Sequence, residues 1–113
     1  MGYRPYIYIK EEGWQSGIEL SKFYGYVDHK ECKSITWLLD HEKVEYPDIF
    51  YYVGLGPDIE FTAEEFREWF ELYLSDIAAY RETHSIEQYD PYDEYPELKD
   101  IYDDDRSKMV EWG

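Results

Sequence analysis

The pattern of apolar and polar positions predicts four strands and two helices. Residues 3–10, YRPYIYIK, are rich in aromatic and β-branched side chains and predict a strand. Pro5 cannot donate a ladder hydrogen bond, which favours either a sheet edge or a position without such a bond. A second strand is predicted over 18–24. Its alternation is imperfect, and Ser21 could instead begin a short helical turn.

The first predicted helix covers residues 28–43. Asp28 and Glu31 match a capping box at its start, and Pro47 stops any helix before it. Its buried stripe would consist of apolar residues at helical spacing, namely Cys32, Ile35, Leu38 and Leu39.

The second predicted helix has the strongest local signal in the chain. Thr62 and Glu65 stand at the spacing of a capping box, and the helix should run to about Tyr80 or His84. Its inner face would consist of residues spaced three and four apart, namely Phe66, Trp69, Phe70, Tyr73, Leu74 and Ile77.

The order of these elements predicts the fold class. Short apolar runs at 49–53 and 59–61 would pair as a hairpin that precedes the second helix. We therefore expect an α+β protein, with an antiparallel sheet of about four strands and two helices on one face. Residues 1–84 would form a single domain. Residues 85–113 would be an acidic, Tyr-rich tail, irregular up to 105 because two prolines interrupt it, with apolar residues near its end docked on the domain.

Composition indicates what kind of partner such a protein could bind. The chain has 113 residues, and its formal charge is 11 − 27 = −16. This charge argues against binding nucleic acid or an anionic membrane and favours a basic partner. No signal peptide or membrane-spanning run is recognised, and Cys32 is the single cysteine, so the expected location is the cytoplasm.

The acidic tail contains the most unusual stretch, YDPYDEYPELKDIYDDD at 89–105. It holds eight carboxylates and four tyrosines but one lysine. Carboxylates at this density can imitate a series of phosphates, and tyrosines supply rigid contact area at interfaces. The alternative is a solvated tail that only confers solubility. The candidate partner-binding residues here are Asp90, Tyr92, Asp93, Glu94, Tyr95, Glu97, Asp103, Asp104 and Asp105.

The second helix adds three further candidates, Glu64, Glu68 and Glu71. Their spacings of four and three place them on one face, where like charges destabilise a helix slightly. Mimicry of a polyanion would explain that cost, and an ordinary solvated face is the alternative.

Metal binding and catalysis have weak support in the sequence. His29, Cys32 and His41 lack the further ligands that a structural zinc site needs, and a thiol in the buried stripe is the simpler interpretation of Cys32. The acidic tail offers oxygen ligands without the spacing of an EF-hand, so weak adventitious calcium binding is an alternative. No nucleophile, phosphate-binding or dinucleotide motif occurs. We therefore predict a protein that is not an enzyme and needs no cofactor or metal.

Aromatic strand segments suggest a second way of binding a partner. The segment YIY at 6–8 and the segment FYY at 50–52 are expected to place rings on both faces of their strands. One face would be core, and the other could form an exposed aromatic patch for a partner or for homodimerisation.

The short length, the MGYRPYIYI opening and the acidic, Tyr-rich composition are similar to small orphan proteins of phages and mobile elements. In its charge the chain resembles anti-CRISPR and anti-restriction inhibitors that act as DNA mimics. The likeness is one of composition and carries no functional residue across. It implies a non-catalytic inhibitor of a basic nucleic-acid-handling protein, such as a nuclease, in the cytoplasm of a host cell. The alternative is a small structural or regulatory interaction module, homodimeric through its aromatic face.

Overall fold

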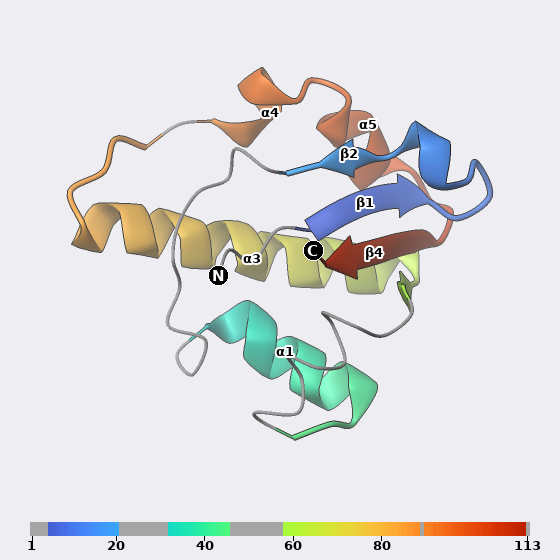
Figure 1. Cartoon of the computed structure of the whole chain (residues 1–113), viewed down its shortest axis with the longest axis horizontal. Helices are drawn as coiled ribbons and strands as arrows, with labels where there is room; N and C mark the ends of the chain where they lie inside the picture. Colours follow the sequence, from blue (N-terminus) through green and yellow to red (C-terminus); the bar gives the residue numbers. More distant parts are fainter. Residues whose placement is uncertain (1–4, 21–31, 46–57, 89, 113) are drawn as a thin grey trace.

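A computed structural model of the chain describes residues 5–20, 32–45, 58–88 and 90–112 (Figure 1). The strands there are β1 (Pro5–Ile9), β2 (Ile18–Glu19), β3 (Ile59–Phe61) and β4 (Lys108–Trp112). The helices are η1 (Trp14–Ser16), α1 (Lys33–Glu42), α3 (Ala63–Thr83), α4 (Pro91–Glu94) and α5 (Leu98–Asp103). The strands form one antiparallel sheet in the order β2-β1-β4-β3, so the predicted α+β class is confirmed.

Strand β4, from the end of the chain, lies inside the sheet. It pairs with β1 from Pro5↔Trp112 to Ile9↔Lys108, and its other edge pairs with β3. The apolar residues near the C-terminus were expected to dock on the domain, and they form one of its central strands.

Strand β1 also lies inside the sheet, between β2 and β4. An edge position for Pro5 is therefore wrong. Pro5 is the first residue of β1, a position where a missing N–H is tolerated, and its carbonyl accepts a hydrogen bond from the Leu20 N–H at 3.0 Å.

Side chains alternate strictly along β1. Ile7 and Ile9 face the core, and Tyr6 and Tyr8 face the opposite side of the sheet. The expectation that YIY places rings on both faces is thus wrong, because a period of two puts the first and third residues together. The segment at 50–52 lies outside the described residues.

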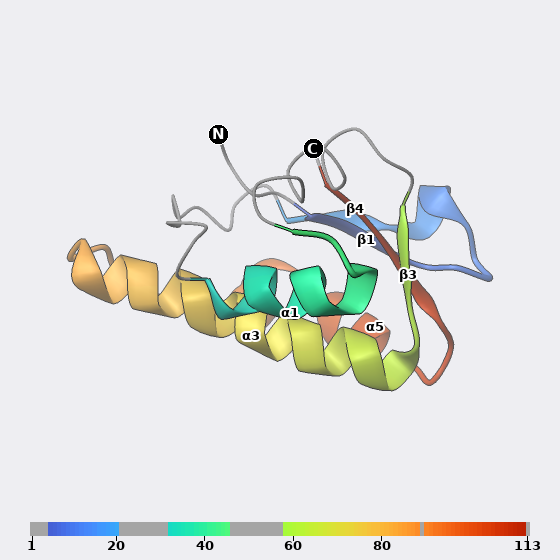
Figure 2. The ribbon, with the colours of Figure 1, turned by 90° about the horizontal axis from the view of Figure 1, so that it is seen from below.

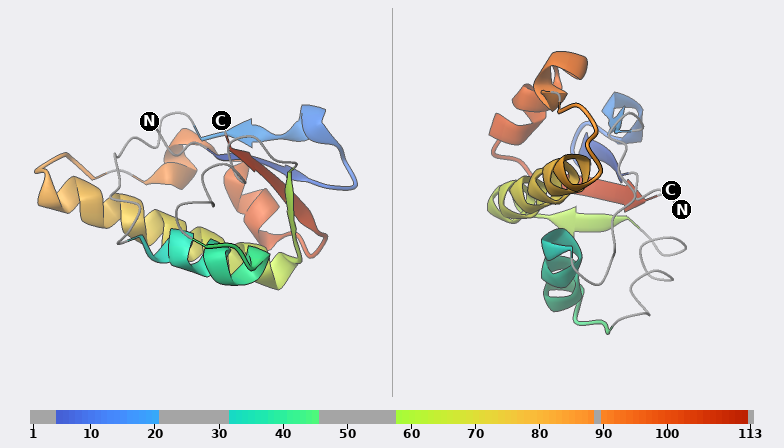
Figure 3. Two further views of the ribbon diagram at one scale, coloured as in Figure 1. Left: turned by 60° about the horizontal axis from the view of Figure 1, so that its bottom comes forward. Right: turned by 90° about the vertical axis from the view of Figure 1, so that its left-hand side faces the viewer.

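The α-helices α1, α3 and α5 cover one face of the sheet. Figures 2 and 3 show α1 and α3 side by side and antiparallel, and in Figure 2 α5 lies on the same side of the strands. The core between the layers contains the predicted stripes, with Leu39 and Leu74 partly buried at its margin. Its largest fully buried side chains are Trp69, Tyr73, Phe61, Phe66 and Phe70.

Helix α3 begins at the predicted capping box. The Thr62 hydroxyl accepts from the Glu65 N–H at 3.2 Å, and the Glu65 carboxylate accepts from the Thr62 N–H at 2.8 Å. The helix runs to Thr83 with His84 as its C-cap, as predicted.

Helix α1 begins at Lys33, and its cap comes from another helix. The buried Asp76 carboxylate of α3 accepts from the N–H groups of Lys33 and Ser34 at 3.1 and 2.9 Å. The Ser34 hydroxyl donates to the same carboxylate at 2.6 Å. This tertiary cap satisfies donors that a helix start leaves unpaired. The predicted capping box at 28–31 lies outside the described residues.

Two other predictions are only partly covered by the described residues. The strand predicted over 18–24 corresponds to β2 in its first two residues, and 21–24 are not described. The hairpin partner of β3 was expected at 49–53, which is also not described. Within the described ranges, β3 pairs with β4.

The prediction that residues 85–105 are irregular is wrong for 91–94 and 98–103, which form α4 and α5. Pro91 starts α4, because the first helical position needs no N–H, and the Asp90 side chain caps it by accepting from the Tyr92 N–H at 2.9 Å. No helix within the described ranges combines the length and apolar character that crossing a bilayer requires.

Candidate functional site

Arg67 of α3 holds the acidic tail against the domain. Its Nε donates to the Tyr102 carbonyl at 2.8 Å. Its Nη2 donates to the carbonyls of Asp103 and Asp104 at 3.0 and 3.1 Å, and to Oδ1 of Asp105 at 2.9 Å. The carbonyls at the end of α5 thus meet a cation, the charge that a helix C-terminus favours.

Lys108 of β4 supports the same helix end. Its side chain is fully buried, its ammonium donates to the Asp104 carbonyl, and the ammonium lies 6.0 Å from the centroid of the Phe66 ring. Burial lowers the pKa of Lys108 from its usual range. Two cations from different elements therefore fix where the acidic tail leaves α5.

Two tyrosines of the tail lie among carboxylates from three elements. The Tyr102 hydroxyl donates to Oε1 of Glu71 at 2.5 Å, and this hydrogen bond, followed by burial, raises the pKa of Tyr102 to about 12. Burial raises the pKa of Tyr92, and the charges of Glu71, Asp103 and Asp90 raise it further. We call Glu71, Asp90, Tyr92, Tyr102 and Asp103 the tyrosine–carboxylate cluster.

The cluster brings together candidates that are far apart in the sequence. Glu71 comes from α3, Asp90 from the cap of α4, and Asp103 from the end of α5. Tyr102 was not among the predicted site residues. Its place in a run of aspartates was visible, but its contact with an α3 residue 31 positions away was not.

The remaining candidates differ in their surroundings. Glu64 and Glu68 are exposed and share a face of α3 with Glu71. The other exposed carboxylates belong to α4 or to the N-cap position of α5, namely Asp93, Glu94 and Glu97.

Two of the predicted aspartates already have partners within the chain. Asp104 binds the Arg106 side chain, with Nη2 to Oδ2 at 2.9 Å, and accepts from the Arg106 N–H at 2.8 Å. These hydrogen bonds hold the pKa of the Asp104 carboxyl well below its usual range. Asp105 pairs with Arg67, so both aspartates help to fold the segment.

Tyr92 and Tyr95 were predicted to anchor a partner, and both are partly buried against the hydrophobic core. Tyr102 packs there as well, with its ring centroid 6.4 Å from that of Phe70. Docking the segment accounts for these rings without any partner. The carboxylates, and not the phenols, are therefore the exposed part of the candidate surface.

His41 occupies a second polar site, between α1 and α3. Its Nδ1 lies 2.5 Å from Oε2 of Glu42, its Nε2 lies 3.0 Å from Oε2 of Glu65, and its ring stacks on Trp37 at 4.8 Å. The hydrogen bond from the Thr62 N–H lowers the pKa of Glu65, and the charge of His41 lowers it further. This site joins two helices and serves packing.

Metal ligation has no geometric support within the described ranges. No group of three or more His, Cys, Asp or Glu side chains there is arranged to hold a metal ion. The Cys32 thiol is buried in the core next to α1, and His29 lies outside the described residues.

The arrangement as a whole presents carboxylates that can accept hydrogen bonds and attract cations. Comparison of the chain with protein-family models, curated protein sequences and solved structures finds no match. Any function must therefore be argued from the surface itself.

Proposed function

We propose that the protein is a non-catalytic inhibitor that binds a basic nucleic-acid-handling protein through the acidic surface of α3, α4 and α5. The partner is expected to be a nuclease or another nucleic-acid-binding protein. The chain itself would contact neither nucleic acid nor a membrane, because its formal charge is −16.

The tyrosine–carboxylate cluster carries this proposal. Intramolecular contacts fix the backbone that bears its carboxylates, so these charges have set positions. When such a surface binds a positively charged groove, no conformational entropy is lost in ordering a flexible tail. Pre-organisation of this kind improves affinity. Complementary charge also raises the association rate and makes binding sensitive to salt.

The carboxylates that would contact the partner are the exposed ones. On α3 these are Glu64 and Glu68, next to Glu71 of the cluster. On the tail they are Asp90, Asp93, Glu94, Glu97 and Asp103. Asp104 and Asp105 belong to the fold through their arginine partners, so changing them tests stability together with binding.

The test uses two variants with the same change in charge. One replaces exposed carboxylates of the proposed surface by amides, namely Glu64→Gln, Glu68→Gln, Asp93→Asn and Asp103→Asn. The control replaces exposed carboxylates elsewhere, namely Asp40→Asn, Glu45→Gln, Glu82→Gln and Glu87→Gln. Both are immobilised beside the unchanged protein, and proteins are captured from a lysate of the source cell at low and high salt.

We expect the unchanged protein and the control to retain a nucleic-acid-binding protein that high salt or added duplex DNA releases. The surface variant should lose it, and the purified partner should be inhibited in its action on DNA or RNA. Equal loss in both variants would mean that net charge alone matters. A captured protein that DNA does not displace would contradict the mimicry.

The second candidate function is an interaction module that uses the other face of the sheet. The observation that favours it is Trp14, whose side chain is 55% exposed next to Tyr6. If this face makes a homodimer, sedimentation will show a dimer that Trp14→Ala abolishes. Deletion of residues 87–113 would not provide the same test, because it would also remove β4, a central strand of the sheet.

A further inference from the structure

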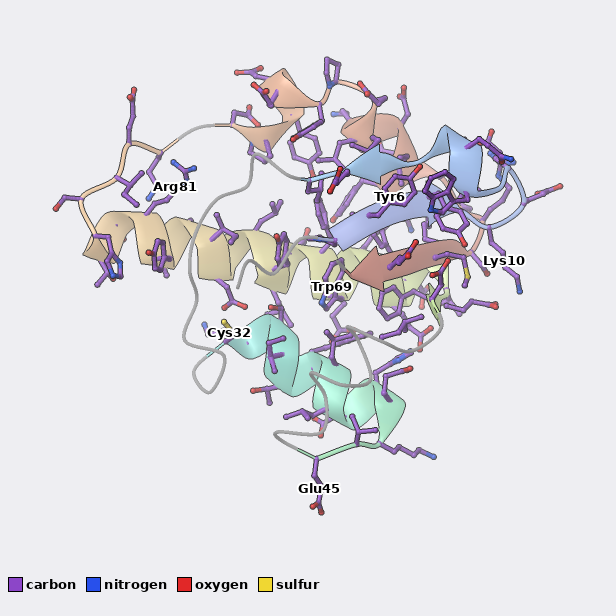
Figure 4. The ribbon with its side chains drawn as sticks, in the orientation of Figure 1. Tyr6, Lys10, Cys32, Glu45, Trp69 and Arg81 are labelled. Atoms are coloured by element: carbon purple, nitrogen blue, oxygen red, sulfur yellow. The ribbon has the colours of Figure 1, made fainter. Side chains whose placement is uncertain are left out.

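Trp14 is fixed at three points on the face of the sheet that the helices do not cover. Its ring stacks on Tyr6, with ring centroids 5.0 Å apart and an interplanar angle of 24°. The Tyr6 hydroxyl donates to the Trp14 carbonyl at 2.5 Å, and the indole N–H donates to Oε2 of Glu111 at 3.1 Å. Figure 4 shows Tyr6 beside the η1 turn that bears Trp14.

The turn around Trp14 is shaped to hold this stack. Gly13, before η1, has a φ of 87°, a conformation that other residues rarely adopt. A Cβ on Gly17, after η1, would lie 2.4 and 2.6 Å from two carbons of the Tyr6 ring. The ring therefore packs directly on the backbone of Gly17, and the two glycines allow the sequence GWQSG to present its tryptophan.

Despite these restraints, Trp14 remains 55% exposed. It is the most exposed of the large apolar side chains in the described part of the chain. A rigid, exposed tryptophan loses little conformational entropy when a partner covers it, and such residues are enriched where binding energy concentrates.

Two carboxylates border the aromatic pair. Glu19 of β2 and Glu111 of β4 are both directly opposite Tyr6 in the sheet, one on each side, and both are exposed. The indole uses only Oε2 of Glu111. Among the described residues, no lysine or arginine forms an ion pair with either glutamate.

We propose that Tyr6, Trp14, Glu19 and Glu111 form a binding site for an arginine side chain of a partner polypeptide. A guanidinium is planar and stacks on an indole face, and its N–H groups pair with carboxylates at the edge of the ring. This site lies on the opposite side of the sheet from α1, α3 and α5. The proposal does not depend on the function proposed for the acidic surface of α3, α4 and α5.

The charges decide between an arginine and other occupants. A nucleobase would stack on Trp14, but its phosphates would meet Glu19 and Glu111. A second copy of this chain, docked by a two-fold axis, would bring these glutamates close to their own equivalents. An arginine gains from the ring and from both carboxylates.

The experiment is an NMR titration of the full chain with N-acetyl-arginine amide. We expect saturable shifts of the Trp14 indole N–H and of the backbone amides of Tyr6, Glu19 and Glu111. N-acetyl-citrulline amide, which has nearly the same shape without the charge, should cause much smaller shifts. N-acetyl-lysine amide should bind more weakly, because it cannot stack as a plane.

Three variants locate the site. Trp14→Ala should weaken arginine binding about two- to fivefold, as expected for loss of an exposed cation–π contact. Glu111→Gln should also weaken it, and this variant keeps the tryptophan in place if the alanine variant folds poorly. Glu45→Gln is the matched control. Figure 4 shows Glu45 beyond α1, far from Tyr6, and the change should leave the affinity unchanged.

Several results would overturn the assignment. Shifts that grow linearly and equally around all carboxylates would indicate non-specific attraction to an acidic protein. Equal affinities of the citrulline and arginine compounds would remove the role of charge. A dimer in sedimentation that Trp14→Ala dissociates would assign the face to a second copy of the chain.

Discussion

Replacement of Arg67 tests whether the acidic tail is part of the fold. The guanidinium donates to three backbone carbonyls at the end of α5 and to the Asp105 carboxylate. Arg67→Ala removes all four hydrogen bonds. Arg67→Lys keeps the charge but loses the planar arrangement of donors.

The magnitude follows from the exposure of each partner. A hydrogen bond to a charged group contributes about 1.5–3 kcal/mol, but water can replace part of it because the Arg67 side chain is 28% exposed. The Asp105 side chain is 94% exposed, so its ion pair contributes only about 0–1 kcal/mol. We therefore expect Arg67→Ala to lower the free energy of unfolding by about 2–4 kcal/mol, and Arg67→Lys by roughly half of that.

Urea denaturation followed by tryptophan fluorescence gives the free energy of unfolding, and amide hydrogen exchange shows where the loss occurs. In Arg67→Ala, the Ile101 and Asp104 amides, which bond within α5, should exchange faster than amides in the middle of α3. Asp105→Asn is the control that removes only the exposed ion pair. If Arg67→Ala costs no more than this control, or leaves α5 exchange unchanged, the docking of the tail is not what holds α5.

Three further predictions concern other parts of the fold. Asp76→Ala leaves three donors at the start of α1 without their acceptor. Urea denaturation should therefore show that the free energy of unfolding falls by about 2–4 kcal/mol. A fall of less than about 1 kcal/mol would contradict the tertiary cap. The folded state raises the pKa of Tyr8 and of Tyr102 from 10.0 to about 12, so the unfolded state loses these protons first and stability should fall as pH rises from 10 to 12. Urea midpoints across this range should show that fall. The double replacement of these tyrosines by phenylalanine should reduce it, and the raised pKa of Tyr92 accounts for a remaining part. Glu68→Gln relieves repulsion with Glu64, and stability should rise by a few tenths of a kcal/mol in low salt; a loss would show that the carboxylate has a structural partner.

Local sequence signals predicted the elements whose causes are local. The capping box of α3 needs only Thr62 and Glu65, three residues apart, and its apolar stripe needs only helical spacing. Both were found where the sequence indicated. Pro91 was misinterpreted as a break because a proline within a helix disrupts it, whereas a proline at the first position starts one.

The sequence could not show contacts between distant elements. The cap of α1 comes from Asp76, 42 residues beyond Ser34, and the end of α5 is held by Arg67, 35 residues before Tyr102. Each contact depends on how helices pack, which no spacing encodes. For the same reason the aspartates at 104 and 105 looked equivalent to the other tail carboxylates, although arginines bind them.

These pairings separate the carboxylates that serve the fold from those that do not. Asp76 caps α1, and its removal should cost stability. Asp104 and Asp105 bind arginines, and the exposed pair of Asp105 contributes little to stability. Glu64 and Glu68 of α3 are expected to have the opposite effect, because repulsion between like charges four residues apart should lower stability. A gain in stability on Glu68→Gln would show that keeping these charges costs stability, and the proposed binding of a basic partner would account for that cost. This is why the matched charge variants, and not the total charge, decide the proposed function.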